Sequence, residues 1–439
     1  MNLLDERWKT FDSHELRLLL DEYIGGPGQY DSEAGSPNKL YLPLARQSCR
    51  VALIFKDKKI ISIEPGPAFT AAQWEEVSNK ISKSLLDGTT KVGREYSFSG
   101  FRVRGSWNGT RCGVQILPPH RESPQAPVEL AEHPFILEFP VMESDFWPLT
   151  NYRRTREHRK LTLLLGVLLR GGTSFHLKQP RHFWADVSQI GSPPQSKWVQ
   201  EFFIAPLGEP VIERLSPPTA EQMEEIGPEA YYGESGHDGG GLRVPADLDE
   251  SIWCYFRLSP ESRGRFDRAL FWMDVADRQW AISFSSSFAA LVSAVESLTE
   301  RGTTHQVYCK ECTTNFSHEV PGATERFRAF FENFAPGASL RSRRSQMYAL
   351  RSGILHGSEL MQLDQDVAFG WDPPGWNERE LHQELWSLTH MALRSWLKNP
   401  PRSGSDGPGT QPSAAGPTGM WSRLSAMICK KLMFLGRRA

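Results

Sequence analysis

The stretch SQMYALRSGILHGSEL, from Ser345 to Leu360, has the pattern of an amphipathic helix but contains two glycines four residues apart, Gly353 and Gly357. Each glycine in a helix interior costs about 1 kcal/mol relative to alanine. Apolar residues recur along the stretch at helical spacing and predict a core-facing stripe made of Met347, Leu350, Ile354 and Met361. We therefore expect a helix over 340–361.

His356 is expected on the outer face of this helix. At about 100° per residue it lies about 200° from Ile354. Gly353 and Gly357 flank it, and small residues there would let another backbone or a nucleic-acid strand approach closely. The alternative interpretation is a helix-packing pair of glycines next to a surface histidine.

Arg351 precedes His356 by five residues, about 140° away on an ideal helix. One helix therefore does not place the two side chains together. The long arginine can cover part of that angle, and a two-fold partner could supply the other half of a shared site.

Segments with helical spacing surround this stretch and predict an all-α bundle over 253–400. They are Arg263–Asp277, Trp280–Glu300, Thr324–Phe334 and Glu378–Lys398.

The N-terminal part is mixed and rich in strands. Arg50–Phe55 and Lys59–Glu64 flank a short charged turn, a helical pattern ends at Gly88, and Asn108-Gly109 is a strong hairpin signal. We expect an α+β chain with a mixed domain over 1–150 and a helix, strands and Gly/Pro-rich loops over 151–252, followed by the bundle. A Pro/Gly/Ser-rich linker over 401–419 and a basic amphipathic tail over 420–439 are expected to come last.

Composition narrows the class of protein. The chain has 439 residues, a formal net charge of −2 and six cysteines, too few for a disulfide framework. The N-terminus lacks the apolar core of a signal peptide, and no apolar run reaches the length of a membrane-spanning helix. We expect a soluble protein of a reducing compartment, the cytoplasm.

The residues from about 260 to 398 resemble the Apea-like group of HEPN domains. The resemblance depends on YALRSGILHG, with Ser352 in the polar slot after Arg351, on LVSAVESL (Leu291–Leu298), and on the order of five helices. It implies a metal-independent endoribonuclease that works as a homodimer. It also implies a role as an effector in phage defence or as a toxin.

The residue types support that chemistry. Histidine transfers protons near neutral pH, so His356 suits an acid or base role, while the planar guanidinium of Arg351 suits phosphate oxygens. Glu296 is the expected helper that orients His356 or Arg351, and Glu359 could contact the imidazole. A non-catalytic scaffold that dimerises or binds RNA or nucleotide is the alternative.

An RNA-binding surface is expected at the start of the same helix. The arginines there have no acidic residue among them, and the tyrosine could stack on a base. These RNA-contact candidates are Arg341, Arg343, Arg344 and Tyr348.

A Cys-x2-Cys pair lies between the second and third helices of the expected bundle. Two nearby histidines would complete a tetrahedral zinc site of His305, Cys309, Cys312 and His318. Free thiols or a redox-active pair are the alternatives, although the βαβ setting of a redox motif is absent. No cofactor is expected for catalysis.

Two basic segments remain. Arg153 and His158 repeat the Arg-x4-His spacing, but a long apolar run follows them, so a buried helix with a basic solvent-facing end is expected. The tail, Met420–Ala439, has the pattern of a segment that lies on an anionic membrane surface or docks on a protein partner. A flexible extension without a function is the alternative.

Overall fold

A computed structural model describes most of the chain. The described residues are 2–25, 29–30, 38–42, 49–67, 69–86, 88–119, 133–169, 173–174, 182–186, 196–200, 207–233, 241–280, 282–300, 302–308, 315–336, 341–365 and 373–401. The expected tail, and the expected linker beyond Pro401, lie outside these residues.

The chain forms two compact units, and neither is continuous in sequence. The first contains residues 1–95, 138–159 and 207–216, and the second contains 96–137, 160–206 and 217–439. The expected boundary near residue 150 does not appear, because one long helix and two long strands each contribute residues to both units. The α+β class expected from the sequence is confirmed.

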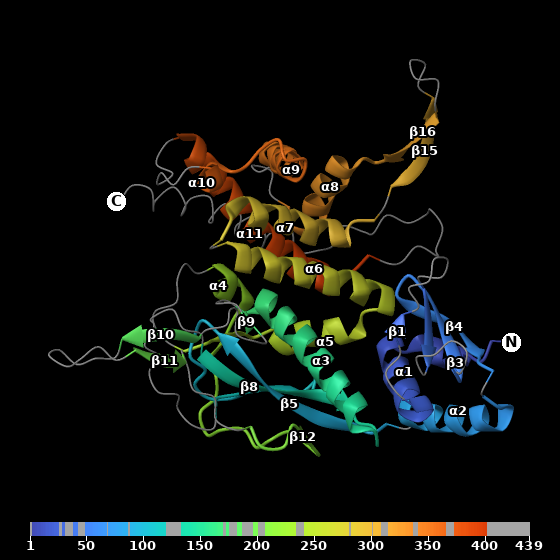
Figure 1. Ribbon diagram of the computed structural model, residues 1–439. Helices are drawn as coiled ribbons and strands as arrows, with labels where there is room; N and C mark the ends of the chain where they lie inside the picture. Colours follow the sequence, from blue (N-terminus) through green and yellow to red (C-terminus); the bar gives the residue numbers. More distant parts are fainter. Residues whose placement is uncertain are drawn as a thin grey trace. The chain divides into compact units, whose positions relative to one another are not determined.

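The first unit contains an antiparallel sheet with helices beside it (Figure 1). The strands follow in chain order as β1 (Gln29–Tyr30), β2 (Lys39–Leu42), β3 (Val51–Lys56) and β4 (Lys59–Pro65). The expected hairpin is confirmed as β3–β4, and its turn residues Asp57 and Lys58 both have positive φ.

Helices of this unit bury apolar residues against that sheet. They are α1 (Ser13–Leu20) and α2 (Ala71–Leu86), with short helical turns η1 (Glu6–Thr10) and η2 (Asp21–Gly25) beside α1. Asp12 begins α1, because its side chain accepts a hydrogen bond from the backbone N–H of His14. Leu19, Leu53 and Ile81 belong to one fully buried core.

A larger sheet has the strand order β12-β5-β8-β7-β6, with β9 paired to β5. These strands are β5 (Thr90–Ser99), β6 (Trp107–Gly109), β7 (Val114–Leu117), β8 (His133–Met142), β9 (Thr173–Ser174) and β12 (Val211–Ile212). The hairpin expected at Asn108-Gly109 exists, but both residues lie in β6 and the turn follows at 110–113. Gly113, with a φ of 65°, provides the left-handed residue of that turn.

Several shorter elements and one long helix complete the description of this part of the chain. They are α3 (Trp147–Leu168), β10 (His182–Asp186), β11 (Ser196–Gln200), β13 (Glu225–Ile226), α4 (Pro228–Gly233) and β14 (Val244–Pro245).

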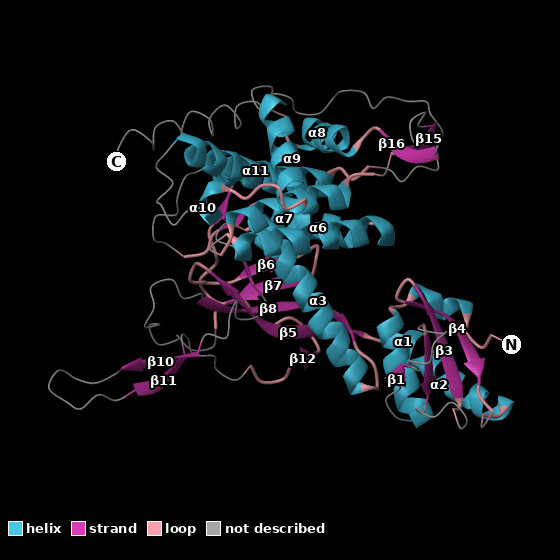
Figure 2. Ribbon diagram, turned by 45° about the horizontal axis from the view of Figure 1, so that its top comes forward, coloured by secondary structure: helices cyan, strands magenta, loops and turns pink. Residues whose placement is uncertain are grey.

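The second unit contains the expected helical bundle (Figure 1 and Figure 2). Its helices are α5 (Leu248–Arg257), α6 (Pro260–Gln279), α7 (Phe284–Leu298), α8 (Ala323–Phe334), α9 (Arg341–Leu355), α10 (Gln362–Gln365) and α11 (Pro373–Lys398). The five helices expected from the sequence exist as α6, α7, α8, α9 and α11, with shifted ends: α7 begins four residues later than expected, α9 ends six residues earlier and α11 begins five residues earlier.

Residue chemistry explains how the bundle begins and packs. Ser259 and Ser283 cap α6 and α7 by accepting backbone hydrogen bonds, and Pro260 occupies the first turn of α6. α7 is buried on most of its surface, with α6, α9 and α11 among its neighbours. Phe266 of α6 stacks on Trp396 of α11 at a ring separation of 5.4 Å.

A two-stranded hairpin, β15 (Thr303–Tyr308) and β16 (Asn315–Val320), lies between α7 and α8 in the chain and extends away from the bundle helices (Figure 1). No helix in the described part of the chain combines the length and apolarity needed to cross a lipid bilayer.

Candidate functional site

The α9 helix ends in a glycine-based cap. Gly357 has a φ of 71°, and its N–H donates to the carbonyl of Ile354 while the N–H of Ser358 donates to the carbonyl of Gly353. These are the two hydrogen bonds of a Schellman motif, which makes His356 the C-cap residue. The expected helix to 361 is therefore wrong, and the side chain of His356 is placed by the cap rather than by helical periodicity.

Gly353 makes room for a side chain of the same chain. A Cβ built on Gly353 would lie 2.6 Å from the carboxyl carbon of Glu359 and 2.9 Å from its Cγ. The backbone N–H of Glu359 also donates to the Gly353 carbonyl at 3.2 Å. The expectation that Gly353 leaves a gap for an outside surface is corrected, because the returning segment fills that gap.

Gly357 has a different environment. Nothing lies within 4 Å of a Cβ built on it, and its positive φ favours a residue without a side chain. Its role in helix termination is shown by the cap, whereas close approach by another molecule at this position stays a prediction.

An open groove lies between α8 and the C-terminal part of α9. Its volume is about 440 Å³. Hydroxyl groups and small residues dominate the lining, which is made by Thr324, Ser345, Tyr348, Ala349, Ser352, Gly353, His356, Ser358 and Glu359. Among these lining residues, the exposed ionisable ones are His356 and Glu359.

The His356 and Glu359 side chains are both available to a ligand. Both residues are exposed, and the structure shows no hydrogen bond, ion pair or aromatic contact from either side chain to another described residue. Two groups able to exchange protons thus line one groove without internal partners among the described residues.

The face of α9 beside the groove carries a stripe that includes two arginines. Arg344, Met347, Tyr348 and Arg351 follow the spacing i, i+3, i+4, i+7 and are buried or half-buried. Leu350 and Ile354, expected in the core stripe, are only half-buried. Met347 and Met361, also expected in that stripe, are buried as expected, and Arg344 and the half-buried Arg351 lie on the same side of α9 as Met347.

Glu296 of α7 is the hydrogen-bond partner of Tyr348 and Arg351 in that stripe. One carboxylate oxygen accepts from the Tyr348 hydroxyl at 2.9 Å, and the other accepts from Nη2 of Arg351 at 2.6 Å. The guanidinium also lies over the Tyr348 ring, 5.6 Å from its centroid. Burial and the Glu296 carboxylate raise the pKa of Tyr348. Of the two contacts expected for Glu296, the one with Arg351 is formed, and the structure shows none with His356.

The basic start of α9 is not an open RNA surface. Arg344 is 1% exposed, donates to the Ala335 carbonyl at 3.0 Å and lies over the Phe331 ring. Arg343 pairs with Glu384 of α11 at 2.7 Å. The expectation of RNA contact is corrected for Arg344, whose guanidinium is needed inside the bundle, and stays a prediction for Arg343.

The expectation is also wrong for Tyr348. Its ring packs against Phe327 at 5.3 Å, and only 9% of the residue is exposed, so the ring has no free face for a base. The side chain of Arg341 lies outside what the structure describes.

The structure describes the backbone of two of the four expected zinc ligands. Cys309 and Cys312 lie outside the described residues, whereas His305 and His318 are directly opposite each other in the β15–β16 ladder. Among the described residues, no group of three or more His, Cys, Asp and Glu side chains is arranged to hold a metal.

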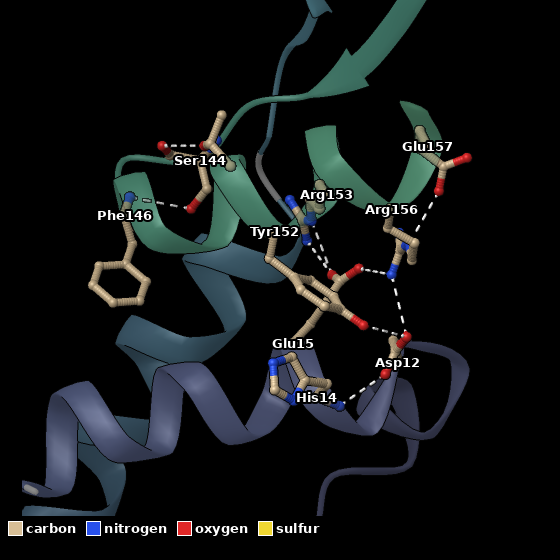
Figure 3. A network of polar contacts seen from close by, with 10 residues as sticks. Asp12, His14, Glu15, Ser144, Phe146, Tyr152, Arg153, Arg156 and Glu157 are labelled. Atoms are coloured by element: carbon tan, nitrogen blue, oxygen red, sulfur yellow. Dashed lines mark hydrogen bonds and ion pairs between the residues drawn. The ribbon is translucent and has the colours of Figure 1, made fainter. Parts of the chain in front are cut away.

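The second Arg-x4-His pair has a structural role within the first unit (Figure 3). Arg153 is 3% exposed and pairs with Glu15 at 2.7 Å, and Arg156 bonds the same carboxylate. His158 is also buried and stacks on Phe139 at 6.0 Å. The expected basic solvent-facing end is wrong for Arg153 and His158.

Sequence reasoning missed the hydroxyl lining of the groove. Thr324, Ser345 and Ser358 come from α8, α9 and the turn after it, and no periodic pattern connects them. The signal available in the sequence is Gly357, because a glycine after a helical stretch predicts a cap and a change of chain direction.

Comparison of the chain with protein-family models, with curated proteins and with solved structures gives no match.

Proposed function

We propose that the helical bundle is a metal-independent endoribonuclease of the HEPN type. The observation that carries the proposal is His356, exposed at the C-cap of α9 in a groove of about 440 Å³ lined with hydroxyl groups. This volume falls within the roughly 300–1,000 Å³ typical of small-ligand pockets. Groove hydroxyls can donate to and accept from phosphate and ribose oxygens.

Cleavage would use the RNA's own 2′-hydroxyl. The 2′-oxygen attacks the adjacent phosphorus, the bond to the 5′-oxygen breaks, and the products are a 2′,3′-cyclic phosphate and a 5′-hydroxyl. His356 transfers a proton in this step, which general acid–base catalysis makes faster by about 10²–10⁴-fold. No step requires a metal ion.

Arg351 has a narrower role in this proposal than the sequence suggests. Glu296 holds one edge of its guanidinium, and 20% of the side chain remains exposed. The remaining N–H groups would supply positive charge to phosphate in a homodimer that pairs two bundles. In the cell such an enzyme would be a cytoplasmic effector of phage defence or a toxin.

A non-catalytic scaffold is the second candidate, and a specific observation favours it. Arg343, Arg344 and Arg351 all have partners inside the bundle, so they contribute little free positive charge for RNA. A bundle that dimerises, or binds RNA or nucleotide without cutting it, is compatible with that pairing.

RNA cleavage in excess chelator separates these candidates. Purified wild-type protein is expected to cleave RNA, and His356→Ala is expected to lose about 10²–10⁴-fold in rate. His14→Ala is the matched control, because His14 is also exposed but belongs to the first unit. Cleavage that requires added magnesium, or that is unchanged in His356→Ala, contradicts the proposal.

A structural zinc ion is a separate proposal for the β15–β16 hairpin. Its ligands would be His305, Cys309, Cys312 and His318, and it is supported by the cross-strand pairing of the two histidines. Metal analysis should find about one zinc per chain, lost in the Cys309→Ser/Cys312→Ser double variant. Equal metal content in both proteins would contradict it.

A further inference from the structure

We infer that Glu359 is a second catalytic residue of the groove, the general base that takes the proton of the RNA 2′-hydroxyl. This inference rests on the proposed function and deepens it. It assigns the base to Glu359 and the acid to His356, so that one protomer carries both proton-transfer groups.

The first observation in favour of this role is that the fold holds the Glu359 carboxylate in a defined position. Gly353 has no side chain, and the Glu359 side chain occupies the space in which a Cβ would lie. The Gly353 carbonyl accepts from the N–H groups of Ser358 at 3.0 Å and of Glu359 at 3.2 Å, and from the Ser358 hydroxyl at 3.2 Å. Three hydrogen bonds to one carbonyl therefore fix the segment that carries the carboxylate.

The second support is the absence of a neutralising partner within the described structure. The described residues that line the groove include no lysine or arginine, and the structure shows no hydrogen bond or ion pair from the Glu359 carboxylate to any of the described residues. By contrast, the carboxylate of Glu296 on α7 accepts hydrogen bonds from Arg351 and Tyr348 of α9. An acceptor that is held in place but unpaired can take a proton from a ligand.

The third support is the position of His356 in the same lining. The reaction needs one group that accepts the proton of the attacking 2′-oxygen and another that donates a proton to the departing 5′-oxygen. The Glu359 carboxylate accepts the first proton as the new O–P bond forms. The His356 imidazolium donates the second as the bond to the 5′-oxygen breaks, and both groups then exchange protons with water.

The two glycines of the Ser345–Leu360 stretch have distinct roles in this arrangement. Gly357 terminates α9 and places His356 at the cap, and Gly353 makes room for the Glu359 side chain. The helix-interior cost of Gly353 therefore accompanies the space that it leaves for the carboxylate, whereas Gly357 lies beyond the end of α9, where a glycine with positive φ is favoured.

The test compares two substitutions by cleavage rate across a range of pH, in excess chelator. Glu359→Gln keeps the size of the side chain but cannot take a proton, so the rate is expected to fall by about 10²-fold or more. In the wild type the cleavage rate should rise with pH on the acid side of its pH profile, and this rise should be absent in Glu359→Gln. Gly353→Ala should also slow cleavage, because its new Cβ displaces the carboxylate.

Two matched control variants test whether the same kinds of substitution slow cleavage when they lie outside the groove. Glu229→Gln changes an exposed carboxylate on α4, and Gly264→Ala adds a Cβ on α6 that meets only Arg268, at 3.9 Å. Both controls should cleave RNA at the wild-type rate, and thermal unfolding should show all four variants folded.

The outcomes distinguish this inference from the proposed function. An active wild-type enzyme with an equally active Glu359→Gln variant and an unchanged pH profile overturns the role of Glu359 alone. If Glu359→Gln is slow but keeps the acid-side rise in rate, Glu359 only positions other groups and is not the base. A wild-type protein that does not cleave RNA in chelator overturns both.

Discussion

The two faces of α9 use charged residues in opposite ways. On the buried face, Arg344 and Arg351 are tied to a carbonyl and a carboxylate of the same bundle. On the groove face, His356 and Glu359 are exposed, without a partner among the described residues. Arg344 and Arg351, two of the basic residues that first suggest RNA binding, thus stabilise the bundle. Within the described part of the chain, His356 and Glu359 are the groove residues left free to act on a ligand.

The largest expected effect is a loss of folding stability at acid pH, caused by two buried histidines of the bundle that lie outside the groove. Burial lowers the pKa of His382 to about 4, with the charge of Asp364 opposing. Burial and the Arg394 charge lower the pKa of His390 to about 3, while a hydrogen bond with the Val167 backbone opposes. The unfolded chain binds these protons near pH 6.5, so stability is complete above that pH and is lost as pH falls toward 4.

The loss at pH 5 relative to pH 7.5 should be about 2 kcal/mol for each of these two histidines. Urea unfolding at the two pH values measures it. Equal stability of the wild type at both pH values would contradict burial of neutral imidazoles.

Arg344→Ala should destabilise the bundle by about 3 kcal/mol, since it leaves a cavity beside Phe331 and an unpaired Ala335 carbonyl. Arg328→Ala, on the exposed face of α8, should change stability by less than about 0.5 kcal/mol. Chemical unfolding measures both. If Arg344→Ala were as stable as the control and bound RNA more weakly, the arginine would belong to the RNA-contact surface after all.

Glu296→Gln should have the smallest effect, a loss of about 1–2 kcal/mol in stability. The amide can still bond Tyr348 but no longer pairs with the charge of Arg351. RNA cleavage by the folded variant should fall far less than in His356→Ala. A loss of cleavage rate as large as that in His356→Ala would indicate that the reaction takes place on the Glu296 side of α9 and not in the groove.

Local signals in the sequence are sufficient for the main helices of the bundle and for one hairpin of the first unit. Helical spacing predicts α6, α7, α8 and α11, and the alternating segments predict the β3–β4 hairpin. The two errors in α9 have different causes: the cap at Gly357 ends the helix early, and polar residues occupy part of its buried side. Periodicity counts only apolar side chains, so it cannot detect the buried stripe that contains Arg344 and Arg351.

The candidate site is predictable only in part. His356 and the link between Glu296 and Arg351 follow from residue type and helix order, and the structure brings the latter pair together. The groove depends on where the chain turns after Gly357 and on Thr324 of α8, which is a tertiary contact that no local pattern contains.

The chemical ends of the RNA fragments test the central claim most directly. Wild-type protein, incubated with RNA in excess chelator, should leave 2′,3′-cyclic phosphate and 5′-hydroxyl ends by mass spectrometry, and His356→Ala should leave almost none. Fragments that carry 5′-phosphate ends, or the same yield of cyclic phosphate from His356→Ala, would contradict cleavage at this groove.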